Sequence, residues 1–244
     1  MPKLILFDID GTLVLTGGAG SRGMTRAFAD VFGVADAFAG ITMPGRTDPL
    51  IVADAVERCG LTADLSALGC FRARYCECLV EELQHDGPRK GVLPGVRRLL
   101  DALGARPDGF PALLTGNYRA AARIKLEYFD LWRYFACGAF GEDAVDRNGL
   151  VEVAVARAAA CGAPRVSAHD VLIVGDTPLD VACAHAAGAC AVAVASGGCD
   201  AATLAASGAE VVFEDLTDTD AFLRLLGERG ALAEAPGSRT QPPR

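Results

Sequence analysis

Lysine is scarce in this chain of 244 residues, which has 23 basic residues of which only three are Lys. No run of basic residues occurs, and the net charge is −8 at pH 7. Proteins that bind nucleic acids present a basic surface, so we expect no nucleic-acid partner. The chain also lacks an uninterrupted apolar run of about 18 residues, the length that a membrane-spanning helix needs. We therefore expect no membrane-embedded segment and no membrane partner.

Paired metal-binding cysteines are missing as well. The nine Cys residues include no C-x-x-C pair, and the three His residues are isolated from one another. A zinc site built from thiolates or imidazoles needs such ligands at short spacing. Free thiols in a reducing compartment fit this pattern better. Residues 1–3 lead into an apolar segment without the features of a secretion signal, so we expect a cytoplasmic protein.

Short apolar runs recur along the chain between segments with helical spacing. We expect strands at residues 4–7, 111–115, 135–140, 171–174, 189–195 and 210–213. Nearly continuous apolar strands separated by helices are typical of a parallel sheet with helices on both faces. The sequence therefore predicts an α/β fold whose core has three layers.

One long segment interrupts this alternation. It contains no convincing strand, and its apolar spacing predicts helices at residues 24–32, 49–59 and 65–83. Glycines flank the segment on both sides, as at a hinge. We expect a core domain of residues 1–15 and 90–228, an inserted all-helical cap at residues 16–89, and a disordered tail at residues 229–244.

Two carboxylates, Asp8 and Asp10, follow the first expected strand. Residues i and i+2 of an extended strand share a face, so these side chains would stand together. Two like charges at that distance repel unless a cation or a shared proton relieves them. An isolated D-x-D is usually only an acidic loop. Here the pair lies between a buried strand and Gly11-Thr12, which favours a functional site.

Polar residues also follow two other expected strands. Thr115-Gly116-Asn117 precedes an expected helix at residues 118–128, where it forms either an anion site or an ordinary helix cap. In Gly175-Asp176-Thr177-Pro178-Leu179-Asp180, the last Asp fits a capping box, but Asp176 precedes the cap. The carboxyl ends of parallel strands share one edge, so these segments should converge. Converging carboxylates suit Mg²⁺.

An acidic site needs a cation to receive an anionic substrate. Lys3 lies at the opposite end of the first strand, and Lys90 lies at the expected hinge. Elimination favours Lys125, with Arg123 as a weaker candidate. The alternative interpretation is that both belong to a solvated face of the helix at residues 118–128.

On these residues, the chain resembles the haloacid dehalogenase (HAD) superfamily, and most closely its phosphoglycolate-phosphatase-like branch with a helical cap. Asp8-Ile9-Asp10-Gly11-Thr12 matches the first motif, D-x-D-G-T. Thr115 matches the second motif, Lys125 fits the third, and Gly175-Asp176 with Asp180 matches the fourth. The resemblance covers residues 1 to about 228. It implies a Rossmann-like core with an inserted cap.

The resemblance implies a Mg²⁺-dependent phosphomonoesterase that acts on a small phosphorylated metabolite. Asp8 would be the nucleophile that forms an aspartyl-phosphate. Asp10 would be the general acid for the leaving alcohol and then the base for the hydrolytic water. Asp8, the carbonyl group of Asp10 and Asp176 would hold Mg²⁺.

The resemblance also implies roles for the remaining motif residues. Thr115 and Lys125 would hold the phosphoryl oxygens, and Gly116 and Asn117 would add to this phosphate site. Asp180 would orient Lys125 or a water on the cation.

Departures from related enzymes narrow the reaction. Dehalogenases of this superfamily lack an Asp at position 10, and phosphonatases use a Schiff-base Lys, which residues 16–89 do not contain. Sugar-phosphate mutases carry a His in the hinge, and residues 17–23 contain none. A phosphotransferase or mutase of this family and a catalytically silent binding protein are the alternatives to the phosphatase.

Substrate choice would depend on the cap. Asp48-Pro49 is typical of an N-cap followed by a first-turn proline. Arg46, just before this helix, could bind a phosphate or a carboxylate, or could be a surface residue of the capping loop. The sequence leaves open the substrate and the pathway, and is compatible with a monomer or a homodimer.

Overall fold

A parallel sheet forms the centre of the protein. The computed structural model describes residues 2–227, and its main sheet has six strands in the order β5-β4-β1-β6-β7-β8. All neighbouring strands are parallel. The strands are β1 (Lys3–Phe7), β4 (Gly109–Leu114), β5 (Gly138–Ala139), β6 (Val171–Gly175), β7 (Cys190–Val194) and β8 (Val211–Phe213). All six expected strands are confirmed, although β5 keeps only two residues.

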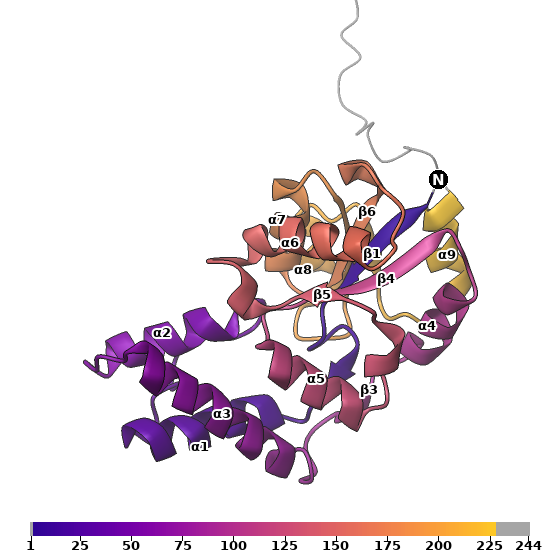
Figure 1. Cartoon of the computed structure of the whole chain (residues 1–244). Coiled ribbons are helices and arrows are strands. Elements are labelled where there is room, and N and C mark those ends of the chain that lie inside the picture. Colours follow the sequence, from indigo (N-terminus) through magenta and orange to yellow (C-terminus); the bar gives the residue numbers. More distant parts are fainter. Residues whose placement is uncertain (1, 228–244) are drawn as a thin grey trace, which may run out of the picture.

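Helices cover both faces of this sheet (Figure 1). Side chains alternate along β1, so Ile5 and Phe7 enter one apolar cluster while Leu4 and Leu6 enter another. The first cluster includes residues of α4 (Val96–Gly104), α5 (Arg119–Tyr128) and α9 (Thr219–Gly227). The second includes residues of α6 (Arg147–Ala160), α7 (Pro178–Ala186) and α8 (Ala201–Ala206). The expected three-layer, Rossmann-like α/β core is confirmed.

Three helices lie to one side of the sheet (Figure 1). They are α1 (Ala19–Phe32), α2 (Asp48–Arg58) and α3 (Leu65–Glu82), and they share an apolar cluster around Phe28, Phe71 and Tyr75. Among the described residues, no strand lies between positions 16 and 89. The helical character of this segment is confirmed, whereas its division from the core as a separate domain stays a prediction.

A small second sheet, which the sequence did not predict, joins the two ends of the helical segment. Strand β2 (Val14–Leu15) pairs antiparallel with β3 (Gly91–Val92). Next to this pair the two glycine-rich stretches meet so closely that a Cβ on Gly87 would lie 2.1 Å from the carbonyl oxygen of Gly17. The two expected hinge segments are therefore in direct backbone contact.

Short 3₁₀ helices complete the described chain: η1 (Trp132–Tyr134), η2 (Gly141–Asp143) and η3 (Ala168–Asp170). Within residues 2–227, no helix combines the length and the apolarity needed to cross a membrane. The tail expected at residues 229–244 lies outside the described residues.

Candidate active site

The acidic pair lies at the carboxyl end of the central strand. The backbone N–H of Asp8 donates to the carbonyl oxygen of Val174, which keeps Asp8 in register with β6. The chain then turns at Gly11, whose φ is +83°. A Cβ on Gly11 would also lie 2.2 Å from Oδ2 of Asp176. Both the positive φ and this close approach therefore require glycine at the turn. The D-x-D-G-T motif thus forms a tight turn against the end of β6.

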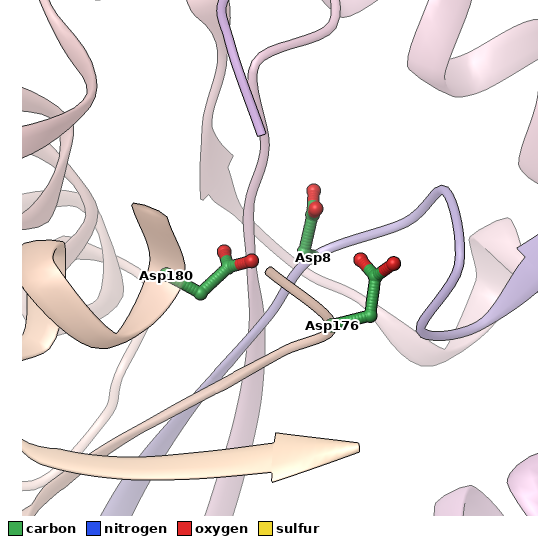
Figure 2. A group of neighbouring side chains, drawn as sticks. All are labelled: Asp8, Asp176 and Asp180. Carbon is green, nitrogen blue, oxygen red and sulfur yellow. The ribbon is translucent and has the colours of Figure 1, made fainter. Parts of the chain in front are cut away.

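Three buried carboxylates face a common space here: Asp8, Asp176 and Asp180 (Figure 2). Each offers an oxygen within 4.8 Å of the others. Burial raises the pKa of Asp8 to about 6, although the neighbouring Arg147 opposes the shift. Burial, followed by repulsion from Asp8 and Asp180, raises the pKa of Asp176 to about 8. Without a cation, Asp176 therefore favours its protonated form at neutral pH.

Asp180 has a structural role at the start of α7. Its Oδ2 accepts hydrogen bonds from the backbone N–H of Thr177 at 3.0 Å and from the Thr177 hydroxyl at 2.7 Å. These bonds form the capping box that the sequence suggested. Its other oxygen, Oδ1, bonds Arg147. Asp180 therefore contacts Arg147, whereas the sequence-based interpretation paired it with Lys125 or with a water.

Arg147 is a site residue that the sequence reasoning missed. It is buried at the first position of α6, and its Nη2 lies 3.1 Å from Oδ2 of Asp8. Its Nη1 donates to the carbonyl oxygen of Gly45, in the segment before α2, at 3.1 Å. The elimination considered lysines first, and no local pattern distinguishes Arg147 from the other arginines. Only the packing of α6 brings it to Asp8.

The predicted cation Lys125 reaches the site and meets Asp10. Its Nζ lies 2.6 Å from Oδ2 of Asp10 and 2.6 Å from Oδ1 of Asn117. Asn117 donates from Nδ2 to the same Asp10 oxygen at 2.8 Å and to the Thr115 hydroxyl at 2.8 Å. As expected, Lys3 lies elsewhere, where it pairs with Asp170 at 2.8 Å. The second motif and Lys125 thus form one network around Asp10.

Asp8, Asp10, Asp176, Lys125 and Arg147 line a cavity of about 440 Å³, which also reaches the helical segment. Arg46 lies on its wall, but its guanidinium pairs with Asp54 of α2 at 2.8 Å. The backbone of Arg46 packs against Gly116, where a Cβ would lie 2.2 Å from the Arg46 carbonyl oxygen. This close approach joins the second motif to the segment before α2.

Asp48 is a second residue whose role the sequence did not predict. It was expected to be the N-cap of its own helix, but the N-cap of α2 is Thr47. The carboxylate of Asp48 instead accepts a hydrogen bond from the backbone N–H of Tyr118, at the start of α5, at 2.8 Å. Its own N–H donates to the Gly116 carbonyl oxygen at 2.7 Å. Burial raises the pKa of Asp48 to about 7, although Lys125 opposes the shift.

The chain belongs to the haloacid dehalogenase-like hydrolases, because the model of that family matches residues 2–188. Its class is that of the phosphatases within this family, a conclusion supported by a curated relative. That relative, a phosphoglycolate phosphatase of Rhodospirillum rubrum, is 32% identical over 246 residues, which cover 97% of this chain and 100% of the relative.

Several solved structures share the fold of this chain. A hydrolase from Pseudomonas syringae has a TM-score of 0.65 at 24% identity and covers 92% of this chain and 98% of its own. A predicted phosphoglycolate phosphatase from Haemophilus somnus has a TM-score of 0.66 at 21% identity, covering 91% and 98%. CbbY from Rhodobacter sphaeroides, solved in complex with phosphate, has a TM-score of 0.65 at 19% identity, covering 89% and 96%. At these identities the likeness shows a shared fold.

Proposed function

We propose that this protein is a Mg²⁺-dependent phosphomonoesterase that hydrolyses a small phosphorylated metabolite through an aspartyl-phosphate on Asp8. One observation carries the proposal. Asp8 lies buried in the cavity between a second carboxylate, Asp176, and a guanidinium, that of Arg147. Such a carboxylate can share a divalent cation on one side, while the Arg neutralises a phosphoryl group on the other.

The donor set fits Mg²⁺. Asp8 and Asp176 offer hard oxygen ligands, and the carbonyl group of Asp10 would complete the protein's share of the site. Their raised pKa values measure how poorly the cluster holds two negative charges by itself. Asp180 is already bonded to Thr177 and Arg147, so we assign it to orientation of the site. The cation would supply positive charge that stabilises the phosphoryl group during transfer.

The chain's own residues would then perform two proton-coupled steps. A carboxylate oxygen of Asp8 attacks phosphorus as the ester P–O bond breaks, and Asp10 gives its proton to the departing alcohol. Asp10 next takes a proton from water, which attacks the aspartyl-phosphate, releases inorganic phosphate and regenerates Asp8. Arg147 balances charge beside Asp8, and the Thr115 hydroxyl and the backbone of Gly116 line the same wall.

The helical segment would exclude water during these steps. Its backbone contacts the core at the cavity through the pairs Asp48–Gly116 and Arg147–Gly45. Enclosure strengthens the electrostatic interactions of the site and protects the aspartyl-phosphate from uncontrolled hydrolysis. A cytoplasmic location and a monomeric or homodimeric state stay predictions.

A substitution at the nucleophile tests the proposal. We expect Asp8→Asn to reduce release of inorganic phosphate from phosphate monoesters to the background rate, because an amide cannot form the aspartyl-phosphate. EDTA should have the same effect on the unsubstituted protein, and added Mg²⁺ should restore activity. Glu57→Gln, an exposed carboxylate-to-amide change on α2, is the matched control and should remain active.

Two outcomes would contradict the mechanism: persistent phosphate release by folded Asp8→Asn protein, or full activity after removal of divalent cations. Product analysis covers the phosphotransferase alternative, since a mutase would return an isomerised sugar phosphate in place of free phosphate.

A further inference from the structure

We propose that Lys125 is a positioning residue for Asp10, and that it is not a ligand of the phosphoryl group. This inference rests on the proposed function, because it assigns a role within that reaction. It replaces the role implied by the family resemblance. The cationic position beside the nucleophile is then left to Arg147.

The first argument is the hydrogen-bond geometry around one oxygen of Asp10. Oδ2 of Asp10 accepts from Nζ of Lys125 at 2.6 Å and from Nδ2 of Asn117 at 2.8 Å. Lys125 can only donate, so its bond to Asn117 requires the amide oxygen of Asn117 to face it. The Asn117 amide group must then face Asp10 and the Thr115 hydroxyl. The orientation of every group in this network is thus determined.

The second argument is the contrast in exposure. The side chain of Lys125 is 5% exposed, whereas that of Asp10 is 41% exposed. Within the described chain, no hydrogen bond is made to the other oxygen of Asp10, Oδ1. The network therefore fixes one oxygen of the carboxyl group and leaves the other available in the cavity. This is the arrangement that a proton-transferring carboxyl group needs.

The third argument is that the two buried cations of the site pair with different carboxylates. Arg147 pairs with Asp8 at 3.1 Å, and Lys125 pairs with Asp10 at 2.6 Å. Among residues 2–227, no ion pair joins Lys125 to Asp8. A phosphoryl group transferred to Asp8 therefore has Arg147 beside it already, without any movement of Lys125.

In the reaction, Lys125 would act only through its hydrogen bonds to Oδ2 of Asp10 and to Oδ1 of Asn117. Oδ1 of Asp10 carries the proton to the ester oxygen as the P–O bond breaks, and later removes a proton from water. Lys125 and Asn117 hold Oδ2 in both steps. Loss of Lys125 would leave Oδ2 with only the Asn117 bond and would remove the group that orients the Asn117 amide, so general acid catalysis would be lost with it.

Substrates whose leaving groups differ in basicity can show whether Lys125 positions Asp10 or binds the phosphoryl group. p-Nitrophenolate departs without a proton, whereas an alkoxide needs one. The value of kcat/KM includes only steps up to departure of the alcohol, so it isolates the first half of the reaction. We would measure it for p-nitrophenyl phosphate and for 2-hydroxyethyl phosphate with the unsubstituted protein, Lys125→Met and Arg147→Met.

For Lys125→Met, we expect kcat/KM to fall about 100-fold with the alkyl ester and less than about threefold with the aryl ester. Arg147→Met should lower both values by similar factors, because it acts on the phosphoryl group. Lys125→Gln retains one donor and should fall between Lys125→Met and the unsubstituted protein with the alkyl ester. It also provides the test if Lys125→Met does not fold.

An equal loss with both esters would overturn the inference, since it would mean that Lys125 binds the phosphoryl group. Unchanged activity with both esters would overturn it as well. Failure of the proposed function gives a different result, namely no turnover of either ester by the unsubstituted protein.

Discussion

Asp48 joins two parts of the molecule with a single carboxyl group. It belongs to α2, yet its carboxyl group accepts a hydrogen bond from the backbone N–H of Tyr118, at the start of α5. A helix N-terminus favours an anion there, whereas burial opposes it. Burial prevails, and the pKa of Asp48 rises to about 7. This residue therefore links the stability of the protein to pH.

Asp48→Asn should remove this pH dependence. The folded pKa of Asp48 is raised to about 7 from 3.8, so its stabilising contribution is complete below the unfolded value and is lost as pH rises toward 7. The amide oxygen can still accept from Tyr118. We expect the variant to gain stability relative to the unsubstituted protein between about pH 4 and 7, on the order of 2–4 kcal/mol.

Urea unfolding at several pH values, without divalent cations, measures this difference. Glu57→Gln, an exposed change on the same helix, is the control and should shift the free energy of unfolding little and equally at each pH. A constant difference between Asp48→Asn and the unsubstituted protein from pH 4 to 7 would show that Asp48 does not titrate in this range.

At the residue scale, the sequence identified the carboxylates of the site but not how its cations pair with them. The meeting of Asp8 with Asp176 was predictable, because both follow buried strands and parallel strands end at one edge. The position of Arg147 was not, since it depends on how α6 packs on the sheet. Elimination identified Lys125 as an available cation, but it could not say which carboxylate Lys125 meets.

At the scale of elements, the two glycine-rich stretches next to β2 and β3 form a close backbone contact between Gly17 and Gly87. A methyl group on Gly87 would meet the carbonyl carbon and oxygen of Gly17, at 2.7 and 2.1 Å. Backbone atoms cannot yield as a flexible side chain can. Any side chain at Gly87 must therefore push the backbone of Gly87 away from that of Gly17.

Gly87→Ala should destabilise the protein by about 1–3 kcal/mol and lower its activity, because the helical segment can no longer seat on the core in the same way. Gly69→Ala is the matched control, since Gly69 lies within α3 and its Cβ would meet no atom within 4 Å. That change should stabilise by about 0.5–1 kcal/mol. Thermal unfolding and phosphate release report both effects, and equal behaviour of the two variants would refute the steric argument.

The elements that sequence analysis predicted best are those whose apolar pattern is local. The expected strands coincide with the six strands of the main sheet, because each is a short buried run. The sequence did not predict the pairing of β2 with β3, because each strand has only two residues and the paired positions are far apart in the chain. The strand expected at residues 135–140 kept only Gly138–Ala139, because the η1 and η2 turns lie close to it.

For the whole molecule, the proposed function implies that a divalent cation bound by the buried carboxylates would stabilise the folded state. Burial and repulsion raise the pKa of Asp176 to about 8, so ionising it without a cation costs free energy. A cation that binds only the folded state stabilises that state by mass action.

We expect Mg²⁺ at about 100 times its Kd to stabilise the protein by about 2.7 kcal/mol, which corresponds to a Tm increase of about 5–10 °C. Asp176→Asn should abolish this increase and should leave the Tm in EDTA unchanged or higher, because it removes a buried carboxyl group whose ionisation is unfavourable. Differential scanning calorimetry with and without Mg²⁺ measures both. An equal Mg²⁺ response in the variant would place the cation elsewhere.

The central place of β1 has a consequence for synthesis of the protein. The strand is flanked by β4 and β6, so Asp8 and Asp10 acquire their partners only from much later parts of the chain. Closing such long loops costs entropy that the final contacts must offset, which delays native pairing. On the ribosome, a chain that has not yet produced β6 would carry Asp8 without Asp176. Under the proposed function, the emerging polypeptide would therefore have no complete active site until β6 has been made.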